Sequence, residues 1–169
     1  HDSLGTPIQE GDRLVWTHGF CGQCVNCIVE NERTLCLNRR AWHGVSTEFP
    51  YLTGSFAEYG YIFPTSGCVR VPDNVPDEVA SAASCALRTV IHGLDRVGEL
   101  DDRHRVVIQG SGPLGLFTLA RVVTSGPANP IMIGGPTKRL ELAQKWGAAH
   151  TIDIDEIPDP AERHAQVME

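Results

Sequence analysis

Four cysteines in the first quarter of the chain have the residue type and the spacing of a metal site. Two residues separate Cys21 from Cys24 and Cys24 from Cys27, and Cys36 follows after a further eight. Four thiolates in one loop can surround a Zn²⁺ ion in a tetrahedron, with sulfur at about 2.3 Å from the metal. Such a site has no open position, so we expect a structural zinc that holds the loop together. A set of free thiols or a redox pair in a reducing cytosol is the alternative.

A glycine-rich turn is the second candidate site. The segment Gly110-Ser-Gly-Pro-Leu-Gly115 has the G-x-G-x-x-G pattern, and it follows an expected strand and opens an expected helix. In such turns the glycines allow a sharp turn, a close approach of a pyrophosphate and tight helix packing, while the helix N-terminus attracts the anion. A plain glycine-rich turn is the alternative. The cofactor-binding residues predicted in this turn are Gly110, Gly112, Pro113, Leu114 and Gly115.

The end of the next expected strand bears on the choice of cofactor. An acid at that place, about 20 residues on, holds the ribose 2′-OH of NAD, but the residue here is Gly134. Lys138 and Arg139 follow at the start of a helix, where either cation could reach a 2′-phosphate. We therefore predict that NADP binds within about tenfold of NAD. The alternative is that both cations are solvated and that other contacts hold NAD.

The elements that must position these sites change in character near residue 100. Before it, turn residues separate short β-type runs, and an Ala-rich stretch that opens at Pro76 and ends at Val97-Gly98 predicts a helix. The strands expected in this half are 13–17, 56–63 and 68–71.

Strands and helices alternate in the second half of the chain. The helices expected there are 113–124, 137–146 and one that begins at Asp159-Pro160, an N-cap followed by proline. The expected strands are 105–109, 130–133 and 151–154. This order predicts the α/β class, with a parallel sheet and right-handed crossovers. Three strands are half of a six-stranded dinucleotide-binding sheet, so we expect the chain to stop inside a domain.

Composition excludes several classes of partner. The 169 residues carry a net charge of −7, and their basic residues cluster no further than in pairs such as Arg39-Arg40, which argues against nucleic acid. With 41% hydrophobic residues the chain is too apolar for disorder. No run approaches the roughly 18 apolar residues of a membrane span. The chain begins at His1 without a signal-peptide pattern, so we expect an incomplete chain of a cytoplasmic protein.

The order of the motifs resembles the zinc-dependent medium-chain alcohol dehydrogenases over nearly the whole chain. That family usually leaves seven residues before the fourth lobe cysteine, and we expect the eighth to be tolerated. The resemblance implies a partial GroES-like catalytic domain in residues 1–98, with the zinc lobe at 18–43, and the first half of a Rossmann domain in 99–169. Besides the cysteines and the glycine turn, the segments that carry it are Gly11-Asp-Arg13, Leu52 to Tyr59, Val71-Pro-Asp73, Pro76-Asp-Glu78 and Arg139 to Ala143.

The resemblance also implies roles for single residues. Cys85 falls where the family has the last ligand of its catalytic zinc, Thr89 where a threonine packs against the nicotinamide, and Arg139 at a basic position near the ribose. Without the resemblance, Cys85 would be interpreted as a small buried core residue. The family's other two ligands belong to Cys-Gly-x-Asp and Gly-His-Glu stretches that this sequence does not contain. We expect His18 and His43 at the lobe surface and Cys68 in the core; none of these, nor His1, matches a ligand position.

The implied activity is reversible hydride transfer between an alcohol and NAD or NADP, with zinc as the Lewis acid of the full-length enzyme. The chain as given, with one of the catalytic ligands, is expected to be inactive. The family forms dimers and tetramers, so we expect a homo-oligomer that binds a small alcohol, aldehyde or ketone. A non-catalytic, zinc-stapled nucleotide-binding module is one alternative. A zinc-free quinone reductase of the same superfamily is another, although the cysteine lobe argues against it.

Overall fold

The chain forms two compact units, His1–Ala80 and Ser81–Glu169. The structure is a computed structural model that describes residues 1–39, 47, 49, 51–54, 56–126 and 129–169. The predicted boundary between two domains at residues 98 and 99 differs from this division into units and stays a prediction.

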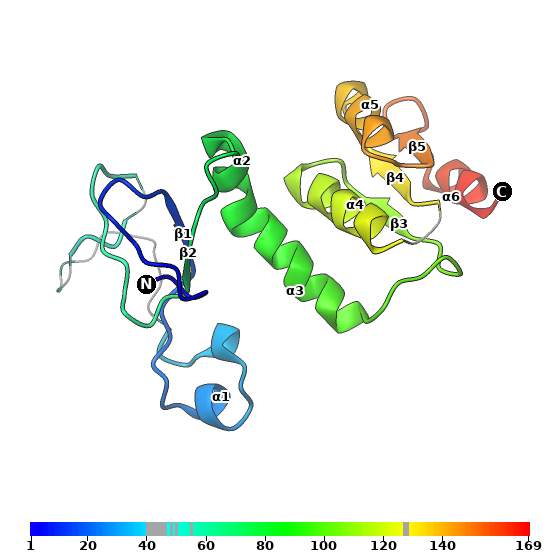
Figure 1. Cartoon of the computed structure of the whole chain (residues 1–169). Coiled ribbons are helices and arrows are strands. Elements are labelled where there is room, and N and C mark those ends of the chain that lie inside the picture. Colours follow the sequence, from blue (N-terminus) through cyan, green and yellow to red (C-terminus); the bar gives the residue numbers. More distant parts are fainter. Residues whose placement is uncertain (40–46, 48, 50, 55, 127–128) are drawn as a thin grey trace. The chain divides into compact units, whose positions relative to one another are not determined.

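A short antiparallel sheet organises the first unit. Its strands are β1 (Leu14–Trp16) and β2 (Cys68–Arg70), and Trp16 pairs with Cys68. The predicted strands at 13–17 and 68–71 are therefore confirmed, each shorter by one or two residues. The cysteine loop leaves this sheet after β1 and contains the short helix α1 (Val25–Ile28) and the 3-10 turn η1 (Arg33–Leu35), as Figure 1 shows.

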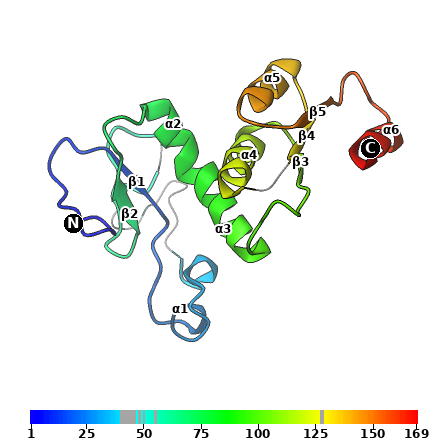
Figure 2. The ribbon, with the colours of Figure 1, turned by 45° about the vertical axis from the view of Figure 1, so that its right-hand side comes forward.

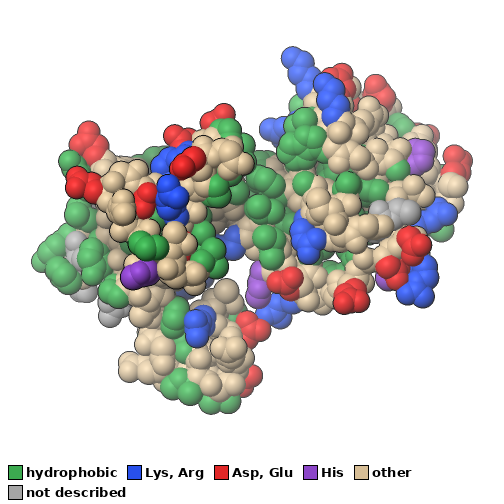
Figure 3. All heavy atoms as spheres, in the orientation of Figure 1, with side chains coloured by type: hydrophobic (Ala, Val, Ile, Leu, Met, Phe, Trp, Pro, Cys, Tyr) green, Lys and Arg blue, Asp and Glu red, His purple; other side chains and the backbone are tan. Residues whose placement is uncertain are grey.

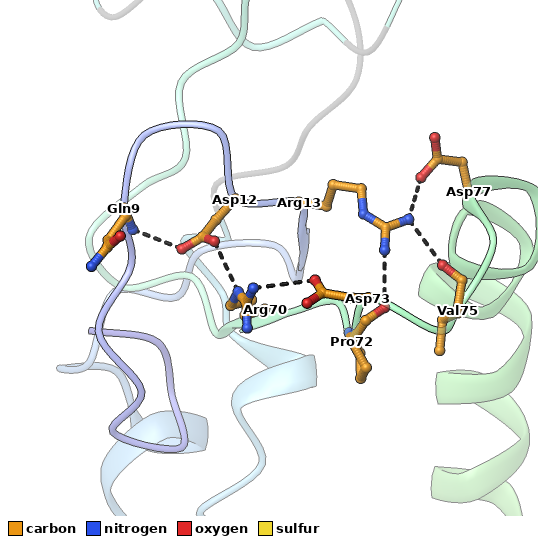
Figure 4. Close-up of polar contacts among 8 residues, drawn as sticks. All are labelled: Gln9, Asp12, Arg13, Arg70, Pro72, Asp73, Val75 and Asp77. Atoms are coloured by element: carbon orange, nitrogen blue, oxygen red, sulfur yellow. Dashed lines mark hydrogen bonds and ion pairs between the residues drawn. The ribbon is translucent and has the colours of Figure 1, made fainter.

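An arginine beside the sheet holds the segment that leads into helix α2 (Asp77–Ala82). The guanidinium of Arg13 donates to the carbonyl oxygens of Pro72 and Val75, each at 2.9 Å (Figure 4). The same group forms an ion pair of 2.6 Å with Asp77 in the first turn of the helix. The network fixes where the helix starts, since three partners within six residues share one rigid fork of donors.

The prediction of a strand over residues 56–63 is wrong. The described part of this segment consists of bends, turns and extended chain, and no described strand pairs with it. Tyr61 donates its backbone N–H to Leu52 at 2.8 Å, while the side chains of Phe56 and Tyr59 are exposed. Aromatic residues favour strands because their side chains pack against neighbouring strands. Phe63 is buried and its ring lies 5.6 Å from that of Tyr61, but this packing forms without a neighbouring strand among the described residues.

The helix predicted from Pro76 to Val97 is confirmed, with a wide turn that the sequence did not indicate. Helix α2 passes into a π-helical turn, η2 (Ala83–Leu87), and then into α3 (Arg88–Val97). Ala86 and Val90 are buried, whereas Cys85 and Thr89 are exposed. Cys85 is therefore not the small buried core residue that its surroundings alone, without the family resemblance, would predict. Within the second unit, η2 and α3 both pack against the helix that follows the glycine turn.

A parallel sheet of three strands forms the centre of the second unit. The strands β3 (Val107–Gln109), β4 (Ile131–Gly134) and β5 (His150–Asp153) are hydrogen-bonded in that order. Ile108 pairs with Met132, and Gly134 pairs with Asp153. The predicted α/β class, with its parallel strands, is confirmed. All three strands end at the same edge of the sheet, which is where ligands bind in folds of this class.

Helices cover both faces of this sheet. Helices α4 (Pro113–Ser125) and α5 (Thr137–Lys145) lie on one face and α6 (Pro160–Met168) lies on the other, as the two views in Figures 1 and 2 show. Asp159 caps α6 by accepting the N–H of Ala161 at 2.9 Å, as the sequence predicts. The core on the α4 and α5 face consists of Ile108, Leu119, Met132, Leu140, Ala143 and Ala148.

The surface is mixed in charge. On the face that Figure 3 shows, acidic and basic side chains are interspersed, and hydrophobic side chains also reach the surface of the cysteine loop. Val25, Ile28 and Val29 are the exposed apolar residues in and next to α1. None of the helices in the described part of the chain has the length and apolarity that a membrane span requires.

Candidate metal centre and dinucleotide site

The four cysteines of the first unit meet in one cluster. One sulfur from each of Cys21, Cys24, Cys27 and Cys36 lies within 4.8 Å of the others. The Sγ atoms of Cys24 and Cys27 are 3.5 Å apart, those of Cys21 and Cys36 are 3.5 Å apart, and those of Cys24 and Cys36 are 4.0 Å apart. Ligands at about 2.3 Å in a tetrahedron are separated by roughly 3.8 Å. The donor set and its spacing therefore fit a zinc ion.

The local backbone explains how the cluster forms. Cys24 has an extended backbone at the start of α1, and its carbonyl accepts the N–H of Cys27 at 2.9 Å, which brings both side chains to one end of the helix. Turn η1 returns the chain, so that Cys36 follows it directly and the Cys21 N–H donates to the Cys36 sulfur at 3.3 Å. The eighth residue in the last spacing is thus accommodated.

Backbone donors around the cluster favour thiolates on one side of it. The backbone N–H of Gln23 lowers the pKa of Cys21 to about 6. That of Leu37 lowers the pKa of Cys24 as well. Burial instead raises the pKa of Cys27 to about 11. A metal binds thiolates and releases their protons, so these N–H donors preorganise part of the site.

Of the two histidines expected at the lobe surface, the structure describes His18. His18 is half-buried, and its side chain is not among the grouped ligands of the described residues. His43 lies outside the residues that the structure describes. Cys68, expected in the core, is half-buried in β2.

The glycine turn between β3 and α4 has open space where a pyrophosphate requires it. Gly110 has a φ of +106°, which favours glycine, and its N–H donates to Ile133 at 2.7 Å. A Cβ atom at Gly110 or Gly112 would meet nothing within 4 Å, whereas one at Gly115 would lie 1.8 Å from the Gly110 carbonyl oxygen. Gly112 is the N-cap of α4, so the first N–H groups of that helix face the open side. The geometry fits a bound dinucleotide.

The end of β4 is tied to this turn by a residue that sequence reasoning missed. Ser111 is 2% exposed, and its Oγ donates to the Gly135 carbonyl at 2.8 Å and accepts the Gly135 N–H at 3.0 Å. A Cβ atom on Gly134 would lie 2.7 Å from the Ser111 nitrogen. Glycine stands at position 134 because the turn occupies the space of a side chain. The sequence signal that could have predicted this contact is the small polar residue between Gly110 and Gly112.

The two basic residues after β4 are exposed at the start of α5. The Arg139 N–H donates to Pro136 at 2.9 Å, which fixes the first turn of the helix, and no hydrogen bond joins the side chain of Lys138 or Arg139 to a described residue. A cavity of about 660 Å³ lies under Gly110 and Gly134, on the sheet face that α6 covers. The cofactor roles of Gly134 and Arg139 remain predictions.

Cys85 and Thr89 lie one turn apart on the helix of the second unit. The Thr89 hydroxyl donates to the Cys85 carbonyl at 2.8 Å, which leaves the threonine methyl as its apolar surface. Both side chains are exposed, so the Cys85 thiol and the Thr89 methyl group are accessible to a ligand. The predicted roles of these two residues are not tested by their positions alone.

Comparison with known proteins decides the family. No family model matches the chain. It is 32% identical over 171 residues to a 5-exo-hydroxycamphor dehydrogenase of Pseudomonas putida, covering 98% of the chain and 45% of the relative. An L-threonine 3-dehydrogenase of Pectobacterium carotovorum is 36% identical over 162 residues, covering 94% and 42%. The crystal structure of an alcohol dehydrogenase from Thermotoga maritima superposes with a TM-score of 0.87 at 33% identity, covering 99% of the chain and 46% of its own. The chain belongs to the zinc-dependent medium-chain alcohol dehydrogenase family.

Membership of this family confirms the resemblance drawn from the motifs. The GroES-like and Rossmann architecture of the alcohol dehydrogenases is the fold expected for the two halves of this chain. The chain spans less than half the length of the relatives that it matches.

Proposed function

We propose that the whole protein is a zinc-dependent oxidoreductase that transfers hydride between a small alcohol and NAD or NADP. The observation that carries this proposal is the turn between β3 and α4. It has open space at Gly110 and Gly112, and the N-terminus of a thirteen-residue helix faces that space. Backbone N–H groups and a helix dipole at this place favour the pyrophosphate of a dinucleotide.

The cysteine cluster has a structural role in this proposal. Cys21, Cys24, Cys27 and Cys36 would hold zinc with four sulfurs, which leaves no position for substrate. A closed site of this kind stabilises a loop that has little core of its own, since several of its apolar side chains are exposed. Loss of the lobe zinc alone is therefore expected to affect the lobe and not the chemical step.

Cys85 and Thr89 are the residues that we assign to the reaction centre. Cys85 would be one ligand of a catalytic zinc, which when bound supplies Lewis-acid polarisation of the substrate oxygen. The hydroxyl of Thr89 is engaged by the Cys85 carbonyl, so its methyl group is the part available to pack against the nicotinamide ring. The exposure of both side chains supports this assignment.

The names of related proteins support the cofactor and the substrate class. An L-idonate 5-dehydrogenase (NAD(P)(+)) of Escherichia coli is 34% identical over 128 residues. A protein of Sinorhizobium meliloti 1021, described as a zinc-binding dehydrogenase, was crystallised with NADP and superposes with a TM-score of 0.66 at 26% identity. We place the protein in the cytoplasm, as a homodimer or homotetramer, on the strength of the family resemblance.

Turnover by the full-length protein tests the proposal. The zinc-loaded protein is mixed with NAD or NADP and a panel of primary and secondary alcohols, and the absorbance of reduced nicotinamide is followed. We expect alcohol-dependent reduction, which Cys85→Ala abolishes while leaving dinucleotide binding and the lobe zinc intact. Cys68→Ala, in strand β2, is the matched control and should keep normal turnover. A near-normal rate in Cys85→Ala would remove that residue from the reaction centre, and dinucleotide binding without any turnover would favour a non-catalytic module.

A further inference from the structure

The end of β5 brings two carboxylates beside the residue that follows β4. A Cβ atom on Gly135 would lie 3.4 Å from Oδ2 of Asp155 and 3.8 Å from Oδ1 of Asp153. The pairing of the strands enforces this closeness, because Gly134 lies opposite Asp153 and its carbonyl accepts the Ile154 N–H at 3.0 Å. Asp153 at the end of β5 and Asp155 two residues beyond it thus lie beside the end of the neighbouring strand.

The two carboxylates differ in what they already bind. Asp153 is 7% exposed, and its oxygens accept the Thr137 hydroxyl at 2.8 Å and the Asp155 N–H at 2.9 Å. The Asp155 N–H and the Thr137 hydroxyl lower the pKa of Asp153, which therefore holds the junction of β5 and α5 as a carboxylate. The side chain of Asp155 is exposed and accepts no hydrogen bond from the part of the chain that the structure describes. Asp155 is the acid that remains available to a ligand.

Strand β4 itself has no room for an acid at its end. A Cβ atom on Gly134 would lie 2.6 Å from Oγ and 2.7 Å from the backbone nitrogen of Ser111. Ser111 cannot move aside, because its Oγ holds both polar groups of the Gly135 backbone. Whatever distinguishes the ribose of NAD from that of NADP must therefore come from a neighbouring element.

We propose that Asp155 is the specificity residue for the cofactor, and that it makes this protein prefer NAD. The inference rests on the proposed function. Its carboxylate stands next to the end of β4, where a dinucleotide-binding fold recognises the adenosine ribose. There it would accept a ribose hydroxyl of NAD and repel the 2′-phosphate of NADP. The end of β4 alone predicts that NADP binds within about tenfold of NAD, whereas the carboxylate of Asp155 predicts a larger preference for NAD.

The positive charges that would attract a 2′-phosphate, and so oppose the effect of Asp155, are on α5. Lys138 and Arg139 are exposed at its start, and no ion pair joins either to Asp155 among the described residues. With the Asp155 charge removed, these cations would face a 2′-phosphate without a competing carboxylate. The repulsion of a 2′-phosphate by Asp155, set against its attraction by the two cations, should therefore determine whether NAD or NADP binds more tightly.

Titration calorimetry of the full-length protein with NAD and with NADP tests the assignment. We expect the wild type to bind NAD more than about tenfold tighter than NADP, and Asp155→Asn to tighten NADP binding by about tenfold while weakening NAD binding a few-fold. Asp155→Ser should give the same shift. Glu156→Gln is the matched control, since it removes the same charge from the next residue of the turn and should leave the preference unchanged.

The outcomes separate this inference from the proposed function. A wild type that prefers NADP, or an Asp155→Asn variant with the wild-type ratio of dissociation constants, would overturn the role of Asp155. An equal change of this ratio in Glu156→Gln would also overturn the role of Asp155, because any loss of negative charge in the turn would then have the same effect. Binding of neither cofactor to the wild type would instead refute the proposed function. Unchanged thermal unfolding of the variants confirms that the comparison is made between folded proteins.

Discussion

Ser111 and Gly135 exchange two hydrogen bonds, in which the serine Oγ donates to the glycine carbonyl at 2.8 Å and accepts the glycine N–H at 3.0 Å. This exchange joins the glycine turn after β3 to the end of β4. It also closes the space beside Gly134, so one small hydroxyl determines what the neighbouring strand can present to a cofactor.

The crowding at Gly134 leads to a stability prediction. Gly134→Ala places a Cβ atom 2.7 Å from the Ser111 nitrogen, and such overpacking should lower the free energy of unfolding by about 1–3 kcal/mol. Gly135→Ala is the control, because its Cβ atom would meet ordinary contacts at 3.4 Å and beyond. Urea unfolding measures both variants. Equal stability of the two would mean that Ser111 does not crowd position 134. Gly134→Asp would carry the same strain, so it is a poor probe of cofactor choice.

The glycines of the turn should separate binding from folding. Gly112→Val adds a side chain in open space, so the fold should tolerate it while dinucleotide binding weakens by a hundredfold or more, roughly 2.7 kcal/mol. Gly115→Ala places a Cβ atom 1.8 Å from the Gly110 carbonyl oxygen and should destabilise the unit by about 3 kcal/mol or more. Calorimetric titration and urea unfolding measure the two effects. Normal cofactor affinity in Gly112→Val would place the pyrophosphate elsewhere.

Metal content tests the cysteine cluster. Cys24→Ser should remove one equivalent of zinc per chain and unfold the lobe, because Cys24 lies 3.5 Å from Cys27 and 4.0 Å from Cys36 at the sulfur atoms. Elemental analysis of reduced protein gives the stoichiometry. Cys68→Ser, outside the cluster, should keep the wild-type zinc content. The assignment fails if Cys24→Ser retains all of its metal.

The pair of Arg70 and Asp12 predicts a pH dependence (Figure 4). The Gln9 N–H and the Arg70 guanidinium lower the pKa of Asp12 below its usual 3.8. Because the pKa is lower in the folded state, the stabilisation is complete above pH 3.8 and is lost as the pH falls through the folded value. Asp12→Asn should therefore lower the urea midpoint at neutral pH, and the difference from wild type should close in acid.

The control for that experiment is Asp73→Asn. Asp73 is the other partner of Arg70, at 3.2 Å, but its side chain is 85% exposed. Exposed pairs contribute little to stability, so the midpoint of Asp73→Asn should stay near that of the wild type at every pH. A larger effect in Asp73→Asn than in Asp12→Asn would contradict the assignment.

The sequence predicted most of the elements and both candidate sites, for local reasons. The cysteine spacing and the G-x-G-x-x-G pattern are short-range signals, and the apolar periodicity of the second half predicts its strands and helices. The prediction of a strand at 56–63 was wrong because a strand needs a neighbouring strand to pair with, and a residue pattern does not reveal that neighbour. Cys85 is exposed within the π-helical turn η2, and the closeness of Asp155 to the end of β4 depends on strand pairing. Neither can be inferred from spacing along the chain.

Hydride transfer is the central claim, and isotope transfer measures it most directly. The zinc-loaded full-length protein is incubated with oxidised cofactor and a panel of alcohols that carry deuterium on the hydroxyl-bearing carbon, and the recovered cofactor is examined by mass spectrometry. We predict deuterium on the nicotinamide ring with the wild type and none with Cys85→Ala. A wild type that holds its zinc and binds the cofactor, yet transfers no deuterium from any alcohol, would contradict the account.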